Sequence, residues 1–171
     1  MSFYQKFAEI GSKYVKKSTL LKHGFNWSPM YRRSTARIIY VSDDLMTIRI
    51  RLPWNYKNKN YVNSIFGGSM FSAVDPIPMT QLMNLIGSDY VVWDKSAQIN
   101  FRKPAKTTLF ADFEFTSEEL ETIKKDVASK NEIEILKTTQ LMDNKGATYC
   151  TVVKTIYVAD KTYYKSKRKK S

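Results

Sequence analysis

The sequence predicts an α+β fold in which an antiparallel sheet wraps around one long, buried helix. Residues 66–86 are apolar around most of the helix circumference, which indicates a helix that is covered on most sides. Several other segments alternate apolar and polar residues, as strands do when one face is covered and the other is wet. With 171 residues the chain suits one domain, which we expect over residues 1–160.

The first element is an amphipathic helix, expected over residues 1–24. Ser2 and Gln5 have the spacing of a capping box, and apolar residues then recur at helical intervals until Gly24. His23 is the only histidine and stands just before this glycine, where an imidazole often contacts free carbonyls at a helix end. If His23 is such a cap, no histidine remains for a catalytic triad or a metal site.

Strands are expected on both sides of the central helix. Residues 34–53 alternate around a polar turn at 42–44, and residues 54–64 show no period and form a loop that leads into the helix. The later strands are expected at residues 90–101, 109–115, 132–142 and 147–158, with a short helix after the capping box Thr116–Glu119 and a hairpin turn at 143–146. A single sheet of this size leaves edges to protect, which favours an oligomer.

Two features of the central helix suggest chemistry. Gly67 and Gly68 begin it, and glycines let a ligand or another chain approach the free amides, where the helix dipole adds roughly half a positive charge. Asp75 is followed by Pro76 and Pro78, so the helix should kink or restart there. The carboxylate either caps the second half of the helix or is an acid of an active site, and the sequence leaves both possibilities open.

The net charge of +12 is concentrated near the end of the chain. Residues 161–171 hold six cations and no acid, and we expect them to form a disordered basic tail that can contact phosphates. Nucleic acid is not the expected partner, because the interleaved basic and aromatic residues of common RNA-binding sheets are missing. Cys150 is the only cysteine and is expected to be packed in a strand, and no apolar run is long enough to cross a bilayer, so a cytoplasmic location is expected.

Three stretches of the chain carry a resemblance: residues 60–75, residues 97–105 (AQINFRKPA) and residues 143–158 (DNKGATYCTVVKTIYV). Through them the chain resembles hotdog-fold proteins of the thioesterase superfamily, and from the first strand onward it is similar to the family catalogued as domain of unknown function 4442. Similar thioesterases of the phenylacetate-pathway type have a motif N-x5-H-G-G-x6-D that enters the central helix. The residues on that spacing here are Asn60, Gly67, Gly68 and Asp75, with Phe66 in place of the histidine.

The resemblance implies a hotdog fold and hydrolysis of acyl thioesters carried by coenzyme A or an acyl carrier protein, without a metal or bound cofactor. Asp75 would be the general base or the nucleophile. The amide of Gly67 would polarise the thioester carbonyl, and Asn60 would assist it or hold the water. Gly68 and Phe66 would contact the substrate. In such enzymes the acid and the amide often come from different subunits, so a homodimer or homotetramer is implied.

Arg102, Lys103 and Lys106 stand where one of the strands ends. They are candidates for binding coenzyme A phosphates, or they are simply solvated. Two other interpretations of the chain stay open. One is a non-catalytic hotdog module, which would bind acyl chains or thioesters without turnover. The other is a basic interaction protein, whose affinity for nucleic acid or anionic lipid would depend on salt and be lost on deleting residues 165–171.

Overall fold

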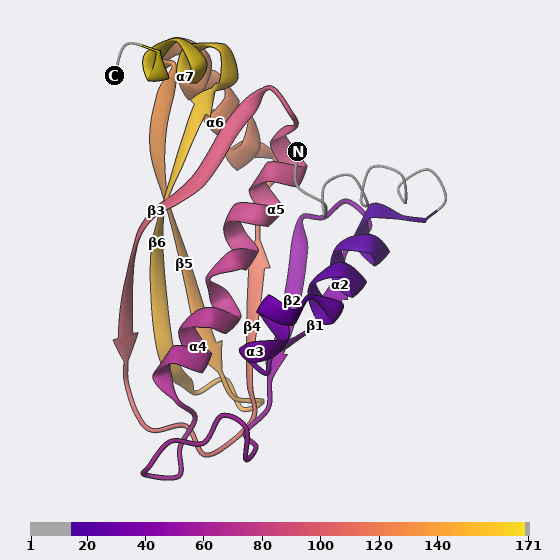
Figure 1. Ribbon diagram of the computed structural model, residues 1–171, viewed down its shortest axis with the longest axis vertical. Coiled ribbons are helices and arrows are strands. Elements are labelled where there is room, and N and C mark those ends of the chain that lie inside the picture. Colours follow the sequence, from indigo (N-terminus) through magenta and orange to yellow (C-terminus); the bar gives the residue numbers. More distant parts are fainter. Residues whose placement is uncertain (1–14, 170–171) are drawn as a thin grey trace.

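The computed structural model describes residues 15–169, in which six antiparallel strands form one sheet wrapped around a central helix (Figure 1). The strand order is β1-β2-β4-β5-β6-β3. The strands are β1 (Arg37–Val41), β2 (Thr47–Leu52), β3 (Tyr90–Phe101), β4 (Leu109–Glu114), β5 (Glu132–Met142) and β6 (Thr148–Asp160). The helices are α2 (Lys17–Trp27), α3 (Pro29–Arg33), α4 (Gly67–Val74), α5 (Pro76–Ile86), α6 (Ser117–Lys130) and α7 (Lys161–Arg168). The predicted α+β class, the antiparallel sheet and the central helix are confirmed.

The first described helix, α2, continues past the glycine that was expected to end it. Residues 1–14 of the expected N-terminal helix lie outside the described residues, and α2 runs through Gly24 to Trp27. The prediction that His23 caps the helix end is wrong, and its ring lies 5.4 Å from the ring of Trp27. A glycine within a helix costs only about 1 kcal/mol, whereas Pro29 keeps Ser28 in an extended conformation and stops the helix.

The two edges of the sheet differ in how they are covered. Helix α2 covers the edge strand β1, where the amide of Asn26 donates to the carbonyl of Ile38 (2.8 Å) and its oxygen accepts from the Ile38 amide (2.9 Å). Lys22 donates to the carbonyl of Ile39 at 2.7 Å. The other edge strand, β3, is 12 residues long, and residues 95–98 are exposed. The open edge of the sheet is therefore β3.

The core lies between the inner face of the sheet and the central helix. On β2, Ile48, Ile50 and Leu52 are buried while the residues between them are not, so the predicted alternation is confirmed. Cys150 of β6 is fully buried, as expected of a packed thiol. Burial raises the pKa of the Cys150 thiol to about 11. Of the helices that the structure describes, none has the length and hydrophobicity to cross a bilayer.

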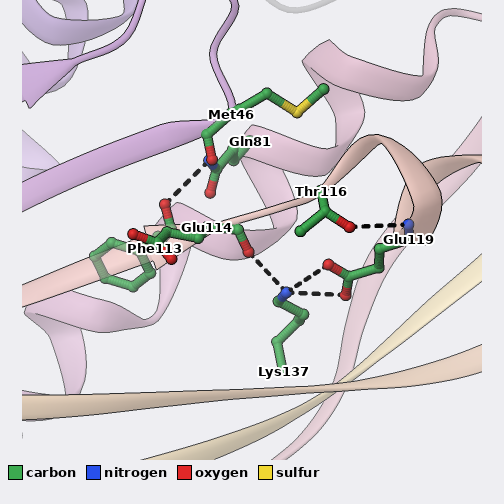
Figure 2. A network of polar contacts seen from close by, with 7 residues as sticks. All are labelled: Met46, Gln81, Phe113, Glu114, Thr116, Glu119 and Lys137. Atoms are coloured by element: carbon green, nitrogen blue, oxygen red, sulfur yellow. Dashed lines mark hydrogen bonds and ion pairs between the residues drawn. The ribbon is translucent and has the colours of Figure 1, made fainter.

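Strands β4 and β5 pair at one position, and farther along β4 side chains from other elements bind its backbone carbonyls (Figure 2). Phe110 pairs with Met142 near one end of the two strands. Farther along β4, the amide of Gln81 on α5 donates to the carbonyl of Phe113 at 3.3 Å, and it also contacts the carbonyl of Met46 at 3.0 Å. Gln81 is fully buried and so ties the central helix to β4 and to the residue before β2.

Lys137 of β5 binds the end of β4. Its ammonium donates to the carbonyl of Glu114 (2.8 Å) and to both carboxylate oxygens of Glu119 (2.9 and 3.0 Å), as Figure 2 shows. The hydroxyl of Thr116 accepts from the amide of Glu119 at 3.1 Å, which confirms the predicted cap of α6. Lys137 therefore links β4, β5 and the first turn of α6.

The chain after β6 is helical over residues 161–168, so the prediction of a disordered tail is wrong for the described part. The carboxylate of Asp160 caps α7 by accepting from the amide of Tyr163 at 2.8 Å. Lys167 binds both carboxylate oxygens of Glu132 at 2.7 Å, and this contact fastens α7 to the start of β5. A cap and an ion pair to a distant strand thus oppose the charge repulsion on which the prediction was based.

Candidate functional site

The central helix is interrupted at Asp75, as predicted. Helix α4 ends at Val74 and α5 begins at Pro76, and the two helices continue in nearly the same direction (Figure 1). Asp75 keeps right-handed helical angles (φ −46°, ψ −53°), so the interruption comes from missing amide hydrogens and not from a turn of the chain. The Asp75 side chain forms no hydrogen bond to the amides of α5. The interpretation of Asp75 as a helix cap is therefore wrong.

Two buried side chains donate to carbonyls at the interruption. The hydroxyl of Tyr31 donates to the carbonyl of Ala73 at 3.0 Å, and the ammonium of Lys154 donates to the carbonyl of Asp75 at 2.6 Å. Tyr31 is fully buried, and burial raises the pKa of its hydroxyl, which keeps it a hydrogen-bond donor. Carbonyls near the interruption of the helix are thus bonded by side chains from α3 and β6.

Lys154 also binds two carboxylates. Its ammonium lies 2.6 Å from Oδ1 of Asp75 and 2.6 Å from Oδ2 of Asp94, and its side chain is only 1% exposed. Together with the carbonyl of Asp75, these contacts use all three protons of the ammonium. A lysine in this position would be very costly to bury alone, so the two acids are what allows it to face the core.

The two carboxylates have different surroundings. The Asp75 side chain is 44% exposed, and within the described part of the chain nothing bonds its second carboxylate oxygen. The Asp94 side chain is 23% exposed, and its Oδ1 is buried without a partner. Burial raises the pKa of Asp94, although the hydrogen bond from Lys154 opposes this. Asp75 is therefore the more exposed of the two acids, and Asp94 is the one with a buried oxygen that has no partner among residues 15–169.

A β-bulge follows Asp94 in β3, beside Lys154. The register of β3 on β6 shifts between Asp94 and Ser96, so Asp94 pairs with Ile156 and Ala97 pairs with Lys154. Ile156 and Lys154 are two residues apart and share the inner face of the sheet, and the bulge therefore brings Asp94 and Ala97 to that face as well. Without the extra residue, one of these two positions would point away from the helix.

Aromatic rings lie over the glycines that begin α4. A Cβ on Gly67 would come within 2.7 Å of the ring of Phe101 on β3, and a Cβ on Gly68 within 2.3 Å of the ring of Phe66. The close approach that the glycines were expected to permit is thus made by two phenylalanines. Phe66 is 57% exposed and Phe101 is 55% exposed, so both rings are open to solvent at the helix start.

Asn60 organises the loop before α4. Its Oδ1 accepts from the amides of Val62 (3.1 Å) and Ser64 (3.0 Å), and its Nδ2 donates to the hydroxyl of Ser64 at 2.9 Å. These bonds engage both polar atoms of the Asn60 side chain within its own loop. The structure therefore places Asn60 in the segment that leads to the helix start, as a residue that shapes it.

The strand exit with its three cations lies next to the same segment. The amide of Ile65 donates to the carbonyl of Ala105 at 2.8 Å, which joins the exit to the residue before Phe66. Arg102, Lys103 and Lys106 are exposed. Arg102 contacts the hydroxyl of Thr151 at 3.5 Å, and the ammonium of Lys103 lies 4.4 Å from the ring centre of Tyr149.

Sequence reasoning missed Lys154 and Asp94. A signal for Lys154 was present, because it is the one charged residue in an alternating series on β6 whose other members are Cys150, Val152, Ile156 and Val158. Nothing in the sequence marks the bulge after Asp94 that puts both Asp94 and Ala97 on the inner face. In residues 15–169, no three His, Cys, Asp or Glu side chains gather in a way that could hold a metal ion.

Residues 19–158 match the family described as Domain of unknown function (DUF4442). No curated protein matches the chain.

Several solved structures resemble this fold. PA5026 from Pseudomonas aeruginosa, described as a protein of unknown function and probable thioesterase, has a TM-score of 0.73 at 19% identity, over 83% of this chain and 95% of that one. OLEI01261 from Chlorobaculum tepidum, of unknown function, has a TM-score of 0.66 at 14% identity over 83% and 93%. Thioesterase HI1161 from Haemophilus influenzae has a TM-score of 0.58 at 11% identity over 83% and 90%. The likeness confirms the hotdog fold.

Proposed function

Because this chain belongs to the family Domain of unknown function (DUF4442) and has the hotdog fold, we propose that it is an acyl-thioester hydrolase. Its substrates are acyl groups carried by coenzyme A or an acyl carrier protein. The observation that carries the proposal is the Asp75 carboxylate, which is half-exposed at the interruption of the central helix and held by the buried Lys154. A carboxylate fixed in this way is suited to activate water.

In the proposed reaction, Asp75 is the general base. It takes a proton from water, whose oxygen attacks the thioester carbonyl carbon. The carbon–sulfur bond then breaks, its electron pair leaves with the sulfur, and the proton passes to that sulfur, which yields a carboxylic acid and a thiol. Lys154 is a positioning residue, because it holds the oxygen Oδ1 of Asp75 and leaves the other oxygen for water. A positioned base of this kind contributes roughly 10² to 10⁴ in rate.

The start of α4 supplies the electrophilic side of the proposed site. The amide of Gly67, at the positive end of the helix dipole, stabilises the negative charge that develops on the carbonyl oxygen. Gly68, Phe66 and Phe101 form the rim that contacts the substrate, and Asn60 positions the loop. The exit cations described above add positive charge beside this rim, along the path of an anionic carrier.

The open edge of β3 supports a homodimer. Two β3 strands can pair edge to edge, because the strand is 12 residues long and its central residues are exposed. Ala97 faces the helix side of the sheet near Lys154 and is nevertheless exposed. A second copy on this edge would cover that opening and bring its own residues toward Asp75. A dimer of such dimers would give the alternative homotetramer.

One observation favours the non-catalytic binding module as a second candidate. Phe66 occupies the position where similar thioesterases have a histidine, and its ring lies over Gly68. A site with an aromatic entrance and no second polar group at this point would still hold an acyl chain. Binding of acyl-coenzyme A without thiol release would distinguish this function from hydrolysis.

The test is thiol release from short, medium, long and aromatic acyl-coenzyme A thioesters. We expect one class to be turned over, with kcat lowered by about 10² to 10⁴ in Asp75→Asn. Asp89→Asn is the matched control, because Asp89 is an exposed acid outside the proposed site. Thermal melting of both variants shows whether the fold is retained. Equal activity in Asp75→Asn and wild type, or no thiol release from any substrate, would contradict the proposal.

A further inference from the structure

A second site is suggested by a cavity of about 470 Å³ between α3, the start of β1 and the loop after β2. Four cations line it, namely Arg32 and Arg33 of α3, Arg37 of β1 and Lys57 of the loop, and no carboxylate lines it. The volume lies in the range of small-molecule sites. The lining therefore has room for a ligand and an excess of positive charge.

Nothing among residues 15–169 neutralises this charge, since none of the four cations forms an ion pair. Arg37 also stands directly opposite Arg51 in the pairing of β1 with β2. Like charges in directly opposed positions destabilise a sheet. The neighbouring Arg49, by contrast, binds Asp112 through two hydrogen bonds of 2.6 and 2.8 Å. Within β2, Arg51 at the end that borders the cavity is therefore left without an ion pair in the described part of the chain, whereas Arg49 has one, and this unpaired charge beside the cavity indicates an anionic ligand.

The cavity has apolar and rigid walls as well as charge. Pro29 and Pro53 both line it, and their rings can lie against a flat ligand ring. Thr35, between them, has φ 68°, which is rare for a β-branched residue and costs energy. The buried Asn58 holds this wall, because its amide donates to the Thr35 hydroxyl and to the Pro53 carbonyl, each at 2.7 Å. A strained residue is thus fixed at the cavity by a buried partner.

The same loop connects the cavity to the start of α4. The carbonyl of Asn58 accepts from the amide of Phe66 at 2.8 Å, and Lys59 forms a β-bridge with Ile65. The wall of the cavity is therefore hydrogen-bonded to the residue that precedes Gly67. A ligand with phosphates in the cavity could extend along this loop to the helix start.

We propose that this cavity binds the phosphate groups of a nucleotide, with the base against the two prolines. One guanidinium group can donate two parallel hydrogen bonds to two oxygens of a phosphate, and the four cations offer enough donors for more than one phosphate. The inference deepens the proposed function, on which it rests, by assigning the nucleotide end of coenzyme A to this cavity. The exit cations Arg102, Lys103 and Lys106 then lie outside the nucleotide site.

The test is calorimetric titration with adenosine 3′,5′-bisphosphate, which carries phosphates and a base but no thioester. We expect binding to wild type and a loss of about tenfold or more in Arg32→Gln/Arg37→Gln, because each lost guanidinium–phosphate contact is a strong charge-assisted hydrogen bond. Lys125→Gln/Lys145→Gln removes the same charge from two exposed positions outside both sites and should bind as wild type does. The salt dependence of binding should also be smaller in the arginine variant.

No binding to wild type, or equal loss in the two double variants, would overturn the inference. Binding confined to single-stranded RNA or to anionic vesicles would also overturn it, because the cavity would then belong to a larger surface. The two proposals fail separately, since the titration contains no thioester. Nucleotide binding without hydrolysis refutes the proposed function alone, and hydrolysis with an unchanged KM for acyl-coenzyme A in the arginine variant refutes the nucleotide site alone.

Discussion

Replacing Lys154 by methionine tests the ion cluster at the interruption of the central helix. The change keeps most of the side chain's length and apolar stem but removes the ammonium that binds Asp75 and Asp94 at 2.6 Å each. Because Lys154 is 1% exposed, water cannot replace it, and Asp94 is left with its Oδ1 already buried and unbonded. Removing one partner of a buried pair costs roughly 3–5 kcal/mol of the free energy of unfolding.

We expect the lower end of this range, about 3 kcal/mol, because the Asp75 side chain is 44% exposed and can be hydrated again. The measurement is urea unfolding followed by circular dichroism. Lys95→Met is the matched control, since Lys95 lies on β3 and binds Glu134 on the surface, where such a pair is worth about 1 kcal/mol or less. Adding Asp94→Asn to Lys154→Met should restore about 1 kcal/mol, because it removes the unpaired buried carboxylate.

Losses below about 1 kcal/mol in Lys154→Met, or equal losses in Lys154→Met and Lys95→Met, would refute the reasoning. Either result would mean that the ammonium of Lys154 is hydrated in solution and does not hold the two acids. The proposed role of Lys154 in orienting Asp75 would then fall as well.

Three further predictions concern separate parts of the molecule. The fully buried Cys150, whose pKa burial raises to about 11, should react with a thiol reagent at about pH 8 only after denaturation, and rapid labelling of the native protein would contradict its packing. Because burial raises the pKa of Asp94, the native state binds its proton more tightly than the unfolded state, so wild type should lose stability relative to Asp94→Asn as pH rises from about 4 to about 7. Parallel urea titrations of the two proteins at several pH values measure this difference, and a constant difference would exclude the effect. Neighbouring amides on β3 point to opposite sides of the strand, one toward β6 and the next toward the open edge. Of the variants Ala97→Pro and Gln98→Pro, the one that removes a hydrogen bond to β6 should lose stability, and the one that removes an edge amide should be a folded monomer by light scattering. Two stable dimers would exclude pairing through β3.

Much of the fold could be predicted from local patterns. The bounds of the last four strands agree with the expected ranges to within two residues, and the interruption of the helix at Asp75 follows from two prolines. The errors arose where a local signal competed with a stronger one or with a distant contact. Gly24 predicts a helix end, but Pro29 is the stronger stop, and residues 161–168 are helical where Lys167 binds Glu132 on a distant strand.

The candidate site was predicted in part. The sequence identified the start of α4 and Asp75, because glycines and prolines leave marks that can be read locally. It did not identify Lys154, which is 79 residues away from Asp75 along the chain, or the bulge after Asp94. It also did not identify the basic cavity, whose cations come from α3, β1 and the loop after β2.

By itself, the sequence of this protein determined which segments are strands, where the central helix is interrupted and which acid stands at that point. These properties depend on hydrogen bonding and side-chain periodicity within a few residues. Only the tertiary structure decided what Asp75 binds, whether the amides of α4 lie open or under aromatic rings, and which charges are left without partners. Those depend on the register of β3 against β6 and on the packing of loops, where a shift of one residue turns a side chain from the core to the solvent.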